Sequence, residues 1–194
     1  MLGSSVMVGL GLALASSVLT AQPAVQVDTS QVQGPRQLEE QTKTAAIRGY
    51  LKAWQSMGDA FLQNRADLLD GDFLGAARDK LADTIGEQTK LGFQTRYQDR
   101  AHHIQFVFYS PEGLSIELID HVEYDVQVID HGKPISTVPV SARYVVVLTP
   151  AEVQWKVRIM QADSEPVDHP GSEKVPAGKL TNDQTVRSKA KQGV

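Results

Sequence analysis

The sequence predicts one small α+β domain, because two different patterns follow each other along the chain. Between residues 40 and 92, apolar side chains recur every three or four residues, as on one face of a helix. Between residues 101 and 161, apolar and polar side chains alternate, as in strands with one buried face. Helices followed by strands form separate layers. We therefore expect N-terminal helices packed on a curved antiparallel sheet of about four long strands.

The first half is expected to form two helices. The apolar face of the first consists of Ile47, Tyr50, Leu51, Trp54, Met57, Gly58 and Phe61. The second should run from about Phe73 to Leu91, with Asp72 as a cap for its first turn and Gly92 just past its end. Its narrower inner stripe consists of Leu74, Ala77, Leu81, Ile85 and Gln88.

The second half is expected to form strands at 101–109, 114–130, 134–149 and 153–161, joined by short turns. In the second of these strands, the inner face consists of Ile116, Leu118, Asp120, Val122, Tyr124, Val126 and Val128. The other faces predicted are Ile104, Phe106 and Phe108 in the first strand and Trp155, Val157 and Ile159 in the last. Pro139 has no N–H to donate, which indicates an edge position or a bulge in the third strand.

The two ends of the chain differ in composition from the domain. Residues 6–21 form an uncharged, mostly apolar run, whose length fits a signal peptide slightly better than a full membrane span. We expect a signal peptide or membrane anchor at 1–21, a linker at 22–40, the domain at 41–163 and a disordered tail at 164–194. The protein should then be periplasmic or secreted, or held in the inner membrane if the leader is not cleaved.

Charge and cysteine content exclude several functions. The 194 residues include 19 basic and 23 acidic side chains, a net charge of −4, so the sequence lacks the positive charge typical of nucleic-acid binding. The chain contains no cysteine, which excludes disulfides, thiol catalysis and cysteine-based zinc sites. No motif for a serine nucleophile, a phosphate loop or a dinucleotide is present, and we expect no cofactor.

The order of four short motifs resembles the nuclear transport factor 2-like superfamily. They are AIRGYLKAWQ at 46–55, LLDGDFL at 68–74, ARYVVVL at 142–148 and QWKV at 154–157. The detail is most similar to the branch found at the C-terminus of a chloroplast division protein and in the membrane anchor of the mitochondrial import motor. The resemblance covers about residues 43–162 and implies a cone-shaped sheet closed by helices. The superfamily includes SnoaL-like and ketosteroid-isomerase-like enzymes, but this sequence shows no catalytic set that matches theirs.

Asp120 is the candidate catalytic residue. Strict alternation would place it on the apolar face, where a carboxylate has a raised pKa unless it is paired. A bulge near residues 119–121 would instead turn Asp120 outward and Ile119 inward. Because long curved strands often contain bulges, we expect the outward orientation.

The histidines and aromatic residues are the remaining candidates. His102 and His103 point to opposite faces of one strand, and His121 and His131 add no convergent set, so we expect no metal site. The candidate ligand-binding residues within the cone are Tyr50, Trp54, Tyr124, Tyr144 and Trp155. The alternative for each of these five is a packing role in the core.

We therefore expect a non-catalytic exported or envelope-tethered domain that binds a partner protein or an apolar ligand. The partner could also be a second copy of the chain, bound through the sheet as a homodimer. A third possibility, a secretion-system scaffold, would require that the leader remain as an anchor. The alternative is a small-molecule isomerase or hydratase that uses Asp120 with Tyr50 or Tyr124. The orientation of Asp120, and a tyrosine hydroxyl within its reach, distinguish these functions.

Overall fold

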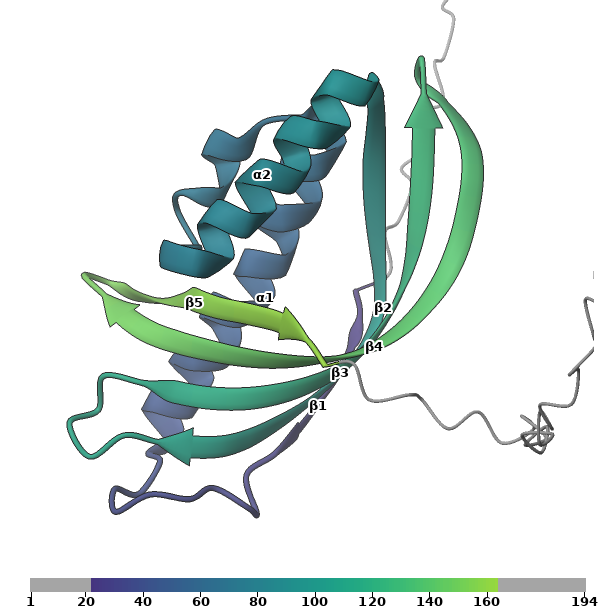
Figure 1. Cartoon of the computed structure of the whole chain (residues 1–194). Helices are drawn as coiled ribbons and strands as arrows, with labels where there is room; N and C mark the ends of the chain where they lie inside the picture. The colour runs from purple at the N-terminus through teal and green to yellow at the C-terminus, as the bar shows by residue number, and fades with distance from the viewer. Residues whose placement is uncertain (1–21, 164–194) are drawn as a thin grey trace, which may run out of the picture. The chain divides into compact units, whose positions relative to one another are not determined.

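The computed structural model describes residues 22–163, which form two α-helices and a five-stranded sheet (Figure 1). In chain order the elements are β1 (Ala24–Asp28), α1 (Glu40–Gln63), a 3₁₀ turn η1 (Ala66–Leu69), α2 (Gly75–Leu91), β2 (Phe93–Tyr109), β3 (Ile116–Asp130), β4 (Lys133–Ala151) and β5 (Gln154–Ala162). The strands lie in the order β1-β2-β3-β4-β5, and β2 to β5 are antiparallel. The α+β architecture predicted from the sequence is confirmed.

Both helices lie on the same face of the sheet, which curves around them (Figure 1). We call this the inner face and the opposite one the outer face. The buried residues of α1 are Ala46, Gly49, Tyr50, Ala53, Trp54, Met57, Ala60 and Phe61. This face is rotated from the predicted one towards small residues, while Ile47 and Leu51 are only partly buried. The reason is close packing, since Gly49 lies against the backbone carbonyl of Trp155 in β5.

Helix α2 begins later than predicted, and Asp72 does not cap it. The residue before the helix is Leu74, and no side chain caps that end. Gly92 ends the helix in the left-handed conformation, with a φ of 80°, as predicted. The buried residues of α2 include Ala77, Ile85 and Gln88.

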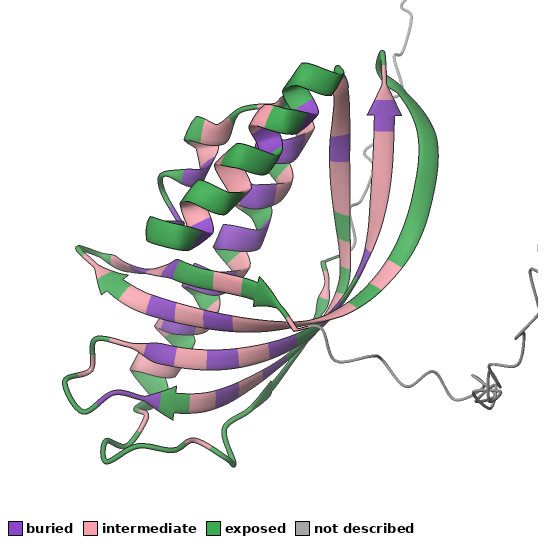
Figure 2. Cartoon of the chain, viewed as in Figure 1, coloured by how far each residue is buried: buried purple, intermediate pink, exposed green. Residues whose placement is uncertain are grey.

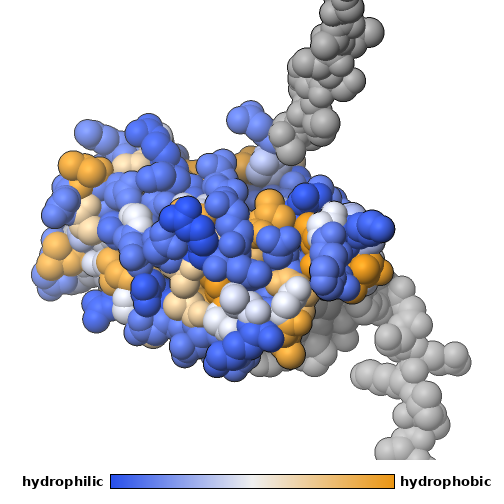
Figure 3. All heavy atoms as spheres, turned by 90° about the horizontal axis from the view of Figure 1, so that it is seen from above, coloured by the Kyte–Doolittle hydropathy of each residue, from blue (hydrophilic) through white to orange (hydrophobic). Residues whose placement is uncertain are grey.

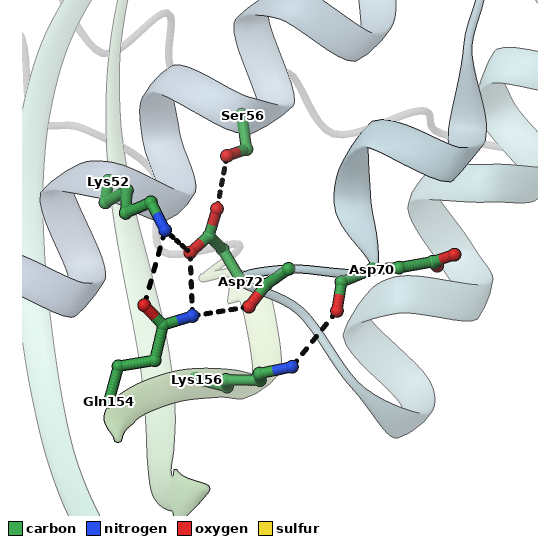
Figure 4. Close-up of polar contacts among 7 residues, drawn as sticks. Lys52, Ser56, Asp70, Asp72, Gln154 and Lys156 are labelled. Carbon is green, nitrogen blue, oxygen red and sulfur yellow. Dashed lines mark hydrogen bonds and ion pairs between the residues drawn. The ribbon is translucent and has the colours of Figure 1, made fainter. Parts of the chain in front are cut away.

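Asp72 instead ties three elements together (Figure 4). Its carboxylate accepts hydrogen bonds from Ser56 in α1 and from Gln154 in β5, and it pairs with Lys52 Nζ at 3.1 Å. The backbone of 72–74 continues this contact, because Val157 N–H donates to Asp72 O and Leu74 N–H donates to Val157 O. Asp72 is buried, but both oxygens of its carboxylate have hydrogen-bond or ion-pair partners. We therefore assign this cluster a structural role.

The strands alternate between buried and exposed residues, but bulges interrupt this pattern (Figure 2). The register shifts leave Arg100 and Val107 as extra residues in β2, and Arg158 as an extra residue in β5. The predicted inner orientation of two residues is therefore wrong. Phe108 and Ile159 are turned to the outer face, where they are 37% and 41% exposed.

The sheet begins earlier than expected. Residues 24–28, in the predicted linker, form β1, which pairs in parallel with β2 and is exposed along its whole length. Strand β2 itself starts at Phe93, eight residues before the predicted strand. Strand β5 pairs with β4 only from Tyr144 onwards, so within the described residues Pro139 lies on a free edge, as its missing N–H predicted.

The predicted leader at 1–21 and tail at 164–194 lie outside the described residues. Between residues 22 and 163, no helix combines the length and the apolar character needed to span a membrane.

Candidate functional site

Asp120 points inward from the middle of β3 and is fully buried. Its Oδ2 accepts a hydrogen bond from the Tyr50 hydroxyl at 2.8 Å and lies 2.6 Å from His102 Nδ1. Our expectation that a bulge turns Asp120 to solvent is wrong. The register of β3 with β4 is unbroken from Ile116 to Val128, because the extra residues that curve the sheet lie in the neighbouring strands.

His102 is the functional candidate that the sequence analysis missed. It is fully buried on the inner face of β2, and its Nε2 lies 3.7 Å from Oδ2 of Asp99. Residues three apart in a strand normally face opposite sides, but the extra residue Arg100 brings Asp99 and His102 to the same face. The sequence did contain a signal for the burial of His102, because the alternation of inner and outer residues along the strand places it on the same face as Ile104 and Phe106. The bulge that adds Asp99 leaves no such signal.

The charges around His102 favour its protonated form. Burial by itself lowers the pKa of His102, but the nearby carboxylates of Asp120 and Asp99 outweigh it and raise the pKa to about 9. Burial and the negative charge of Asp120 raise the pKa of Tyr50 well above its ordinary value. At neutral pH the cluster therefore contains a neutral phenol and an imidazolium, both of which donate to Asp120.

Of the five predicted ligand-binding residues, Tyr50 belongs to this cluster, and Trp54, Tyr124 and Tyr144 lie around it. The ring of Trp54 lies 5.3 Å from that of His102 and 5.6 Å from those of Tyr124 and Tyr144. The hydroxyls of Tyr124 and Tyr144 are 3.0 Å apart, and Tyr144 is the direct neighbour of Asp120 on β4. Trp155 lies elsewhere, beside Gly49 of α1.

These residues fill the interior rather than line an open space. Tyr50, His102 and Asp120 have an exposed fraction of 0%, and Trp54 has 2%, so solvent has almost no access to them. Their role as ligand contacts stays a prediction, because a ligand would have to displace side chains to reach them.

Four buried polar atoms in the cluster make no hydrogen bond within residues 22–163. They are Trp54 Nε1, Asp99 Oδ1, His102 Nε2 and Asp120 Oδ1. An unsatisfied buried polar group costs about 1–3 kcal/mol, so four together in one place are unusual for a purely structural core. They are the feature of this site that favours chemistry over packing.

The described residues bring together no group of three or more His, Asp or Glu side chains that could hold a metal ion. The acidic partners of His102 lie on opposite sides of its ring, so the three side chains do not converge on one point.

Comparisons with known proteins support the fold and leave the function open. No protein-family model and no curated protein matches the sequence. Among solved structures, the intermembrane-space region of the chloroplast protein ARC6 is similar, with a TM-score of 0.54 and 15% identity. The match covers 66% of this chain and 98% of that one. The chain order of two helices followed by a curved antiparallel sheet agrees with this similarity, and together they identify the fold.

The domain has a nuclear transport factor 2-like fold. A scytalone dehydratase-like protein from Novosphingobium aromaticivorans is also similar, with a TM-score of 0.44 and 14% identity, over 64% of this chain and 89% of that one. The similarity to the ARC6 domain confirms, at the level of fold, the resemblance noted from the sequence motifs. Members of one fold differ in function, so the site must decide what a nuclear transport factor 2-like domain does here.

Proposed function

We propose that this nuclear transport factor 2-like domain is a non-catalytic envelope module that binds a partner protein on the outer face of its sheet. The observation that carries the proposal is an uncovered aliphatic strip, formed by Ile119, Val145, Val147 and Ile159. Ile119 pairs with Val145, and Val147 pairs with Ile159, so the four side chains are contiguous across β3, β4 and β5. Three of them are partly buried, and Ile159 is 41% exposed.

The strip lies opposite to the helices. Its residues alternate with the buried Leu118, Val146 and Leu148, whose side chains face the helices. Both described helices cover only the inner face (Figure 1), so nothing in residues 22–163 covers the strip. A contiguous apolar surface of this kind, with polar residues around it, is typical of a site for protein association.

Other parts of the domain are less suited to a partner. The interior offers little room to an apolar ligand, since its aromatic residues contact one another. The surface seen in Figure 3 is mostly hydrophilic, and its hydrophobic residues lie in small separate groups. We therefore place the partner on the outer face and favour a protein over an apolar small molecule.

The envelope location rests on two independent supports. The uncharged apolar run at 6–21 has the length of an export signal. The similar ARC6 structure is that of an intermembrane-space region, and this likeness supports an envelope location for the present domain. A cleaved leader would place the domain in the periplasm or outside the cell, and an uncleaved one would anchor it in the inner membrane.

A photo-crosslinking experiment in the native cells tests the proposal. A photoreactive amino acid at Ile159 should give one discrete adduct with a different envelope protein, and Val147→Lys in the same chain should abolish it. The matched control is the same probe at Ile135, an exposed residue of β4 outside the strip, which should give no such adduct. Equal adducts from both positions, an adduct that survives Val147→Lys, or an adduct with a second copy of the chain would contradict the proposal.

A second candidate function is acid–base catalysis on a small molecule, as in an isomerase or hydratase. The specific observation that favours it is the buried arrangement of Tyr50, Asp120 and His102, with unsatisfied polar atoms beside it. In this function His102 transfers the proton, Asp120 orients its ring and Tyr50 donates a hydrogen bond. A substrate could reach His102 only if the surrounding aromatic residues moved aside.

Chemical modification of histidine tests this requirement. Diethyl pyrocarbonate should carbethoxylate the exposed His103 quickly and, for a closed core, His102 only when the protein unfolds. Modification of native His102 at a rate comparable to His103, measured by peptide mass spectrometry, would show that the core opens and would support catalysis.

A further inference from the structure

The outer face of the sheet contains a pair of histidines that the sequence separates and the strand register brings together. His103 in β2 and His121 in β3 are direct cross-strand partners. Both side chains are exposed on the outer face, whereas their neighbours His102 and Asp120 are buried on the inner face. The pair lies next to Ile119 of the aliphatic strip but is a separate feature of the surface.

The two histidines line one depression, with a volume of about 290 Å³. Its other lining residues include Gln26 and Asp28 of β1 and Gln105 of β2. Within residues 22–163, neither imidazole has a hydrogen-bond or ion-pair partner, so both rings can turn toward a ligand without breaking a contact. Strand β1 thus forms one wall of the hollow beside the histidine pair.

We propose that His103 and His121 bind one divalent transition-metal ion, of the Cu²⁺ or Zn²⁺ class, on the outer face. Directly opposite residues of antiparallel strands have Cβ atoms about 4.5–5.5 Å apart. An imidazole nitrogen binds zinc at about 2.0–2.1 Å, so two opposed imidazoles can reach the same ion. Imidazole also suits copper and nickel, whereas magnesium and calcium prefer oxygen ligands.

The local charges permit a cation at this position. Arg143 is the neighbour of His121 on β4, but its guanidinium is paired with Asp163, which offsets its charge. Asp28 adds a carboxylate to the same hollow, and Glu123 lies exposed two residues along β3 from His121. The protein supplies two ligands, so water or a ligand from a bound molecule completes the coordination.

Calorimetric titration of the untagged full chain with CuCl₂ and with ZnCl₂ tests the proposal. We expect one ion per chain, tighter binding of Cu²⁺ than of Zn²⁺, and no binding of Mg²⁺. His103→Ala or His121→Ala should each weaken binding by at least about tenfold, since even the loss of an outer-shell partner has this effect. Both residues are exposed, so the variants should fold, which circular dichroism checks.

His131→Ala is the matched control, because His131 is an exposed histidine in the turn that follows β3, beside Asp130 and away from the pair. It should leave the affinity unchanged. Two results would overturn the proposal: a double variant His103→Ala/His121→Ala that binds the metal as the unaltered chain does, or a loss of binding on His131→Ala alone.

Discussion

The imidazole Nδ1 of His102 lies 2.6 Å from Oδ2 of Asp120, and both side chains are fully buried. The two residues come from adjacent strands, and Tyr50 of α1 donates to the same carboxylate oxygen at 2.8 Å. One carboxylate thus connects the helix layer with two strands of the sheet. Breaking one member of such a network leaves its partners unpaired in the core, so its contribution to stability can be measured by substitution.

The free energy of unfolding should depend on pH through His102. Its pKa is 6.5 in the unfolded chain and about 9 in the folded domain, because Asp120 and Asp99 favour the charged form. The contribution of His102 to the free energy of unfolding is therefore fully present below pH 6.5 and is lost as the pH rises through 9, by about 3 kcal/mol in total. Urea unfolding across this range measures the loss. The variant His102→Gln should lack it, and an equal pH dependence in both proteins would contradict the prediction.

Asp120→Leu should lower the free energy of unfolding by about 3–5 kcal/mol, because it leaves Tyr50 and the imidazolium of His102 without an acceptor. Asp120→Asn keeps an acceptor oxygen for Tyr50 and should cost less. Glu123→Leu, at an exposed position of the same strand, is the control and should change stability by no more than about 0.5 kcal/mol. Urea denaturation measures the free energy of unfolding of the three variants. If Asp120→Leu left this free energy unchanged, the carboxylate would not be paired as described.

Two glycines of α1 should respond in opposite directions to alanine. A Cβ at Gly49 would meet the backbone carbonyl of Trp155, so Gly49→Ala should destabilise the domain by about 1–3 kcal/mol through overpacking. A Cβ at Gly58 meets nothing within 4 Å, so Gly58→Ala should stabilise the helix by up to about 1 kcal/mol. Thermal unfolding measures both. Stabilisation by both substitutions would mean that α1 does not pack on β5 at this point.

Trp54→Ala should destabilise the domain by about 3–5 kcal/mol, as expected for the loss of a buried aromatic side chain. Trp54 is 2% exposed and contacts His102, Tyr124 and Tyr144. The control is Val153→Ala at a position that is 94% exposed, where the change should stay within about 0.5 kcal/mol. Chemical denaturation measures the free energy of unfolding of both variants. A loss at Trp54→Ala as small as at Val153→Ala would indicate a loosely packed interior.

Periodicity alone predicted the fold class, both helices and the strands β3 to β5 to within a few residues. The reason is that burial of one face imposes a repeat of 3.6 residues on a helix and of two on a strand. It also placed Asp120 correctly on the inner face, and our expectation of a bulge there was the error. The polar segment 93–100 and the exposed β1 show no such repeat of apolar residues. Their strand structure depends on pairing with a neighbour, which a single segment does not encode.

The tertiary structure decided the contacts that matter for function. The extra residue Arg100 turns Asp99 and His102 to one face, and the register of β2 with β3 sets His103 opposite His121. Packing of α1 on the sheet brings the hydroxyl of Tyr50 to Asp120, 70 residues away in sequence. The sequence by itself determined which elements form and most of the buried positions of β3, because burial of one face is a local pattern, whereas bulges and close packing changed the buried face at Phe108, at Ile159 and along α1. Which buried and exposed groups meet depends on bulges, register and helix docking, and these are properties of the whole sheet.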